Sequence, residues 1–167
     1  MFYMILAANV SHQTLTTCEW LSNTQPHIHS ISSLVRMFRT MMIQERDGAL
    51  YLLQGTPRRW LDQGQAVRIR EAPTWYGPLS LECVSNVREG KVQVQFQVPP
   101  RLGDVPMRVC LRLPKGLRIA SVTLGGRPGH HVPVVADVQG EWINLRGLQG
   151  RVDLTVHTEV DAQSKLQ

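Results

Sequence analysis

Two short segments near the start of the chain carry residue types that could act on a sugar or hold a metal ion. Glu19 stands beside the aromatic Trp20, and His27-Ile28-His29 places two imidazoles on one side of an extended segment. Glycoside hydrolysis normally needs two carboxyl groups about 5 to 9.5 Å apart, and a zinc site needs at least three protein ligands. Because no second carboxylate or third ligand follows at a recognisable spacing, Glu19 is the one catalytic candidate, with a solvated or capping role as its alternative. His27 and His29 could contact a sugar, and helix capping and loop packing are the alternatives. We expect no metal ion or cofactor.

A second group of candidates lies in the middle of the chain. Trp75 and Tyr76 are adjacent aromatic residues on which a sugar ring could stack, and packing at a domain boundary is the alternative. Arg58, Arg59 and Trp60 follow one another a short distance upstream. Planar guanidinium groups bind carboxylates and carbonyls through several donors at once, so we expect these three residues to join two domains.

Charge and composition narrow the possible partners. The 167 residues are 43% hydrophobic and 19% charged, which is enough apolar material for a folded core. The net charge of +5 comes mainly from arginines that are scattered among strand-like segments. Nucleic-acid binding usually needs a basic patch or stripe, so we expect no nucleic-acid partner.

The three cysteines and the first ten residues give information about the cellular compartment of the protein. Cys18, Cys83 and Cys110 are odd in number and lack CxxC spacing, which favours buried thiols in a reducing compartment such as the cytoplasm. Met1 to Val10 is apolar, but it has no basic leading segment and is far shorter than the ~20 residues of a membrane span. We therefore expect neither a signal peptide nor a membrane anchor.

One segment has the period of an amphipathic helix. Its apolar residues recur at helical spacing, with polar residues between them. The pattern predicts a helix over about 31 to 45, capped by His29 or Ser30 and stopped by Asp47-Gly48. The apolar face consists of Ile31, Leu34, Val35, Phe38, Met41 and Met42.

The rest of the chain reads as short strands separated by turns. Lys91 to Val98 alternates strictly between apolar and polar residues, and several other segments do so too. Leu117 and Ile119 change phase to Val122 and Leu124, which predicts a bulge. One helical turn is expected over 57 to 62. About eight strands of this kind predict a mainly β protein, an antiparallel β-sandwich preceded by one amphipathic helix.

The segment Leu-Gln-Gly-Thr-Pro-Arg-Arg-Trp-Leu, followed by a glycine turn, a short strand and Ala-Pro-Thr-Trp-Tyr-Gly-Pro-Leu-Ser, resembles a known hinge. It is similar to the one between the (α/α)6 barrel and the C-terminal β-sandwich of bacterial six-hairpin glycosidases, the α-L-rhamnosidase-like enzymes and their relatives. The likeness covers about residues 20 to 160. It implies that 1–46 contains the last helix of a truncated barrel, that 47–78 is the hinge, that 79–160 completes a sandwich begun at 49, and that 161–167 is a tail.

Three functions follow as hypotheses. The first is a non-catalytic sandwich that supports a barrel domain, since the catalytic loops of such enzymes would precede Met1; carbohydrate would then be bound by the parent barrel, and the helix face could self-associate. The second is a carbohydrate-binding module that uses Trp75, Tyr76 and Trp142. The third is an independent hydrolase that uses Glu19 or the two histidines. Whether this chain alone is an enzyme stays open.

Overall fold

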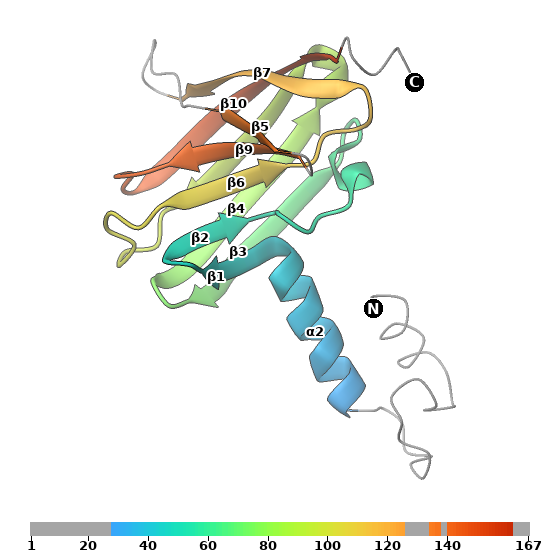
Figure 1. The fold of residues 1–167 in the computed structure, drawn as a ribbon. Coiled ribbons are helices and arrows are strands. Elements are labelled where there is room, and N and C mark those ends of the chain that lie inside the picture. The colour runs from blue at the N-terminus through green and yellow to red at the C-terminus, as the bar shows by residue number, and fades with distance from the viewer. Residues whose placement is uncertain (1–27, 126–133, 138–139, 162–167) are drawn as a thin grey trace. The chain divides into compact units, whose positions relative to one another are not determined.

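The computed structural model describes residues 28–125, 134–137 and 140–161 (Figure 1). The chain divides into two compact units, Met1–Met42 and Ile43–Gln167. In the first unit, the described residues form the helix α2 (Ile28–Met42). In the second, they form ten strands in two five-stranded sheets that pack as a sandwich. The expected mainly β fold with one preceding helix is confirmed.

The first sheet, sheet A, has the strand order β1-β2-β6-β9-β8. Its strands are β1 (Ile43–Arg46), β2 (Ala49–Leu52), β6 (Met107–Leu111), β8 (Val134–Asp137) and β9 (Gly140–Leu145). β2 pairs with β6 in parallel, and the other pairs in this sheet are antiparallel.

The second sheet, sheet B, is antiparallel throughout its described pairs, in the order β3-β4-β5-β10-β7. Its strands are β3 (Ala66–Thr74), β4 (Gly77–Asn86), β5 (Lys91–Gln97), β7 (Leu117–Leu124) and β10 (Arg151–Val160). Two 3-10 turns, η2 (Arg58–Leu61) and η3 (Val87–Glu89), lie before β3 and between β4 and β5. η2 confirms the turn expected over 57 to 62.

The core lies between the sheets and follows mainly from alternation along the strands, although all four residues of β2 are buried. On β5, Val92, Val94 and Phe96 are buried, while the glutamines between them point away from the core. The same holds for β4 and, as far as Val156, for β10, whereas on β6 Val109, Cys110 and Leu111 are all buried. The predicted bulge is also present, because the register between β7 and β10 shifts at His157/Thr158 and leaves Ala120 unpaired.

The boundary of the helix differs from the sequence prediction of 31 to 45. α2 begins at Ile28, so His29 and Ser30 lie inside the helix and do not cap it. It ends at Met42, and the next four residues form β1. Asp47 and Gly48 have φ of 52° and 66°, the conformation of a two-residue hairpin turn between β1 and β2, so their prediction as a helix stop is wrong.

The expected hinge over 47–78 consists of sandwich elements. β2 belongs to sheet A, β3 belongs to sheet B, and η2 lies on the connection between them. The sandwich thus begins with β1 at Ile43 rather than at residue 49. None of the described helices is long and apolar enough to cross a membrane.

Candidate functional site

Three of the candidate residues have no described side-chain geometry. Glu19 and His27 lie outside the described residues, and His29 lies in the first turn of α2, where only the backbone is described. Their predicted roles in catalysis or sugar contact therefore stay predictions. Within 28–125, 134–137 and 140–161, no group of three His, Cys, Asp or Glu side chains could hold a metal ion.

The half-buried Arg58 side chain connects two segments of the sandwich unit. Its Nη1 donates a hydrogen bond to the Leu113 carbonyl, just after β6, and Arg112 Nη1 donates to the Thr56 carbonyl at 3.4 Å. The buried Thr56 hydroxyl in turn donates to the Leu53 carbonyl at 2.8 Å. These contacts hold the connection between sheet A and sheet B. Arg59 is exposed and Trp60 is half-buried, and a domain-joining role for the three residues stays a prediction.

Trp75 and Tyr76 form the tip of the β3–β4 hairpin. The Trp75 side chain is 74% exposed, whereas Tyr76 is half-buried. The Thr74 hydroxyl donates to the Gly77 carbonyl at 2.6 Å and accepts the Tyr76 N–H at 3.2 Å. The tip is therefore an ordered turn that presents one indole ring to solvent, which is what stacking on a sugar requires.

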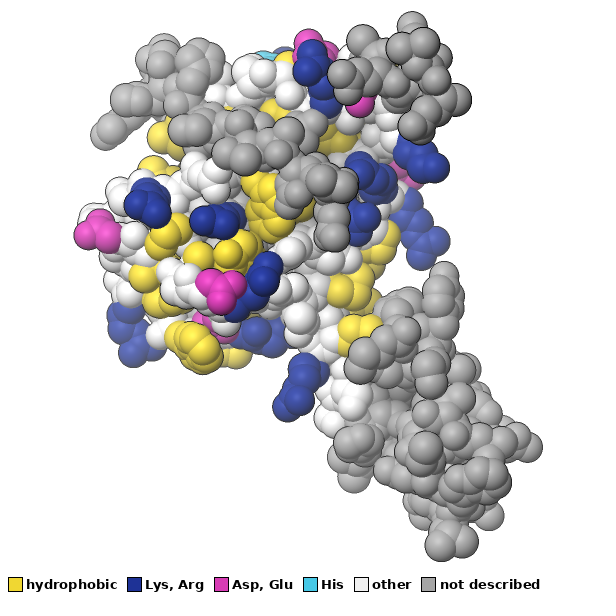
Figure 2. All heavy atoms as spheres, viewed as in Figure 1, with side chains coloured by type: hydrophobic (Ala, Val, Ile, Leu, Met, Phe, Trp, Pro, Cys, Tyr) yellow, Lys and Arg dark blue, Asp and Glu magenta, His cyan; other side chains and the backbone are white. Residues whose placement is uncertain are grey.

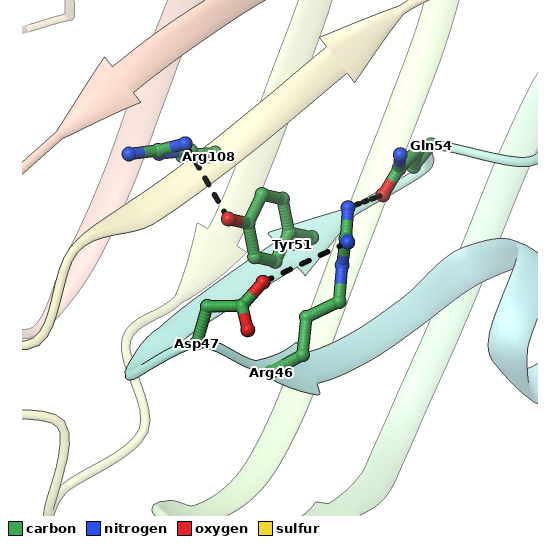
Figure 3. A network of polar contacts seen from close by, with 5 residues as sticks. All are labelled: Arg46, Asp47, Tyr51, Gln54 and Arg108. Carbon is green, nitrogen blue, oxygen red and sulfur yellow. Dashed lines mark hydrogen bonds and ion pairs between the residues drawn. The ribbon is translucent and has the colours of Figure 1, made fainter.

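Tyr51 lies on sheet A between the arginine side chains of Arg46 and Arg108 (Figure 3). The Tyr51 ring is only 7% exposed, with the Arg46 guanidinium 4.6 Å and the Arg108 guanidinium 5.4 Å from its centroid. Trp142 meets it edge-on, with 5.8 Å between centroids. Arg46 also lies 3.7 Å from the Asp47 carboxylate. Cation–π and edge-on contacts thus hold Tyr51 on both sides, so its ring face is not open to a ligand.

Trp142, the third aromatic residue named for sugar binding, is thus separated from the hairpin tip. It lies on β9 in sheet A, whereas Trp75 and Tyr76 belong to a hairpin of sheet B. Figure 2, viewed from the side of sheet A, shows arginine and hydrophobic side chains interleaved over that face. The structure brings Trp75 and Tyr76 together, but it places Trp142 with Tyr51.

An open groove of about 300 Å³ lies on the outer face of sheet B. Outward side chains of β3, β4, β5 and β10 line it, among them Arg68, Arg70 and Arg151. Sequence reasoning noticed the alternation of these strands but treated their polar residues as a solvated face. The signal that could have revealed the groove is the arginine at every second position of Val-Arg-Ile-Arg, which places two cations on one face of a strand.

No protein-family model and no curated protein matches this sequence.

Proposed function

We propose that this chain is a non-catalytic β-sandwich module of a glycosidase-like protein, preceded by the last helix of a helical domain. The proposal rests on the resemblance of residues 47–78 to the hinge of six-hairpin glycosidases and on one structural observation. That observation is the amphipathic helix α2, which leads into β1 with no intervening residue. A helix of this kind gains most of its stability from burying its apolar face against a partner.

The described side chains of α2 lack the burial that such a helix needs. Leu34, Phe38 and Met41 are only half-buried, and Val35 is 64% exposed. Complete burial of a large apolar side chain contributes about 1.5 to 3 kcal/mol. Helices of the parent protein would cover this apolar face and provide that stabilisation. Where those helices are absent, the same face of a second copy of the chain would cover it.

Self-association of the full chain tests this proposal. We expect size-exclusion chromatography with light scattering to show a dimer or larger species, and we expect the double variant Val35→Ser/Phe38→Ser to shift it to the monomer. Arg36→Ser, at an exposed position on the same helix, is the matched control and should leave the assembly unchanged. A monodisperse monomer that binds little apolar dye would contradict the proposal.

The exposure of Trp75 favours a second candidate function, a carbohydrate-binding module. An indole ring 74% exposed on an ordered hairpin tip can stack on a sugar at little entropic cost. Titration with a broad panel of neutral oligosaccharides should shift the tryptophan emission of the full chain, and Trp75→Ala should abolish the shift while Trp60→Phe retains it. If no member of the panel shifts the emission, this function is excluded.

A further inference from the structure

The groove on the outer face of sheet B has an uneven charge balance. Three guanidinium groups line it, from Arg68 and Arg70 on β3 and Arg151 on β10, against the single carboxylate of Glu82 on β4. β4 and β5 lie between β3 and β10 in the sheet (Figure 1). The arginines of β3 and β10 therefore flank the groove on both sides. An anionic group that enters would meet arginines from two directions.

Two of the three arginines are already oriented by neighbouring side chains. Arg68 Nε donates to Glu82 Oε1 at 2.6 Å, across a directly paired position of β3 and β4. Arg151 Nη2 donates to Gln95 Oε1 at 3.0 Å. Each bond uses one of the five N–H donors of a guanidinium group, so most donors stay available to a ligand. Gln95 is neutral, and the Asp153 carboxylate, whose Oδ1 lies 3.9 Å from Arg151 Nε, offsets part of the Arg151 charge.

The third arginine stands next to an irregular point of β3. The register between β3 and β4 shifts between Ile69 and Ala72, and Glu71 has a φ of 46°, which is unusual for a residue other than glycine. The Glu71 N–H donates a hydrogen bond to the side-chain hydroxyl of Ser80 on β4, at 3.0 Å, and not to a backbone carbonyl of that strand. Bulges of this kind redirect side chains and occur often beside binding sites. Among the described residues, no hydrogen bond or ion pair involves the Arg70 guanidinium.

We propose that this groove binds an oligosaccharide that carries carboxylate groups. Arginine forms paired hydrogen bonds with a carboxylate, and the amide and hydroxyl groups of Gln95, Gln97 and Ser80 suit sugar hydroxyls. Glu82 would accept a hydrogen bond from a sugar hydroxyl. The site is separate from the hairpin tip, and the assignment does not rest on the proposed function.

Other anionic partners fit this surface less well. Single-stranded nucleic acid needs exposed aromatic rings for its bases, whereas the one aromatic residue of the groove, Phe96, is 2% exposed and belongs to the core. An extended acidic peptide adds to the edge of a sheet; β3 is an edge strand, but the groove lies over the face of the sheet and crosses β4 and β5, interior strands whose backbone groups pair on both sides. A ligand that contacts the side chains alone, through both hydroxyls and carboxylates, matches the groove.

The test is isothermal titration of the full chain with tri-galacturonate and with its methyl ester, at low and at physiological salt. We expect the ester to bind at least about tenfold more weakly, because it lacks every carboxylate charge and the loss of even one charge-assisted contact is worth about 1.4 kcal/mol. Arg70→Gln should weaken the binding of tri-galacturonate about fivefold to tenfold. Arg118→Gln is the matched control, since Arg118 is an exposed arginine of β7 in the same sheet but outside the groove, and it should bind normally.

Several results would overturn the proposal. These are equal affinity for the acid and its ester, unchanged binding by Arg70→Gln, and equal weakening by Arg118→Gln. Tighter binding of oligo-thymidylate or hexaglutamate than of the uronate would assign the groove to nucleic acid or to an acidic peptide instead. Because Arg70 is exposed and has no described partner, its substitution should leave the unfolding transition unchanged, which thermal unfolding checks directly.

Discussion

The carboxylate of Glu45 on β1 accepts a hydrogen bond from the backbone N–H of Trp75 at the tip of the β3–β4 hairpin. β1 is an edge strand of sheet A, and the hairpin belongs to sheet B, so this bond joins the two sheets at their margin. It also satisfies a turn N–H that has no place in the strand ladder. The orientation of the exposed indole ring therefore depends on a residue thirty positions earlier in the chain.

Removal of the Glu45 carboxylate should loosen the hairpin tip. We expect Glu45→Ala to lower the fluorescence anisotropy of Trp75 and to reduce the free energy of unfolding by about 1 kcal/mol or less, because an exposed charge-assisted bond contributes little. Glu45→Gln retains an acceptor oxygen and is the matched control. Replacement of the other three tryptophans, Trp20→Phe, Trp60→Phe and Trp142→Phe, isolates the Trp75 signal. Equal anisotropy in Glu45→Ala and the parent would show that the bond does not order the tip.

Tyr51 should stabilise the outer face of sheet A through its ring more than through its hydroxyl. Its hydroxyl accepts only a long bond, 3.4 Å, from Arg108 Nη1, whereas the ring is buried against two guanidinium groups and Trp142. We expect Tyr51→Phe to cost less than about 1 kcal/mol and Tyr51→Ala about 3 kcal/mol in urea unfolding. A large loss in Tyr51→Phe would show that the hydroxyl carries the stability.

The strands with strict alternation could be predicted from sequence because each pairs one buried face with one polar face. β5 follows this rule along its length and β10 follows it as far as Val156, and the phase change in β7 correctly indicated the bulge. The helix also has a local signal, the 3.6-residue period, but its end does not. Gln44 and Glu45 are good helix formers, and their place in β1 comes from pairing with β2.

The turn at Asp47-Gly48 shows why such local signals conflict. Asp-Gly ends helices and also forms two-residue hairpins, and the choice between them depends on the strand that follows. The parallel pairing of β2 with β6 joins residues more than fifty positions apart, and no local sequence pattern indicates such a pairing. The groove arises in the same way, because Arg68 and Arg151 belong to strands that become near neighbours only in the folded sheet.

Cys83 should make stability depend on alkaline pH. Burial in the core raises the pKa of its thiol from 9.0 to about 12, because the thiolate would lose its hydration. The unfolded chain therefore releases this proton first, so the stabilisation is complete below pH 9 and is lost as pH rises toward 12. In urea unfolding from pH 8 to 11, Cys83→Ala should show a shallower loss above pH 9, by up to about 1.4 kcal/mol per pH unit. Parallel curves for the two proteins would contradict burial of the thiol.

Gly77, the first residue of β4, should not tolerate a side chain. It has a φ of 115°, and a Cβ there would lie 2.8 Å from Pro100 Cδ and 3.0 Å from Cγ, on a ring that is fixed to its own backbone. We expect Gly77→Ala to cost about 3 kcal/mol, the sum of backbone strain and a contact that requires the chain to shift. Gly64→Ala is the matched control, because Gly64 has a φ of 76° with nothing within 4 Å of the new Cβ. Its cost should be about 1 kcal/mol, from backbone strain alone. Thermal unfolding of both variants separates the cost of backbone strain from the cost of the contact with Pro100. Equal losses of stability in the two variants would show that Pro100 moves freely and that the contact does not constrain the hairpin tip.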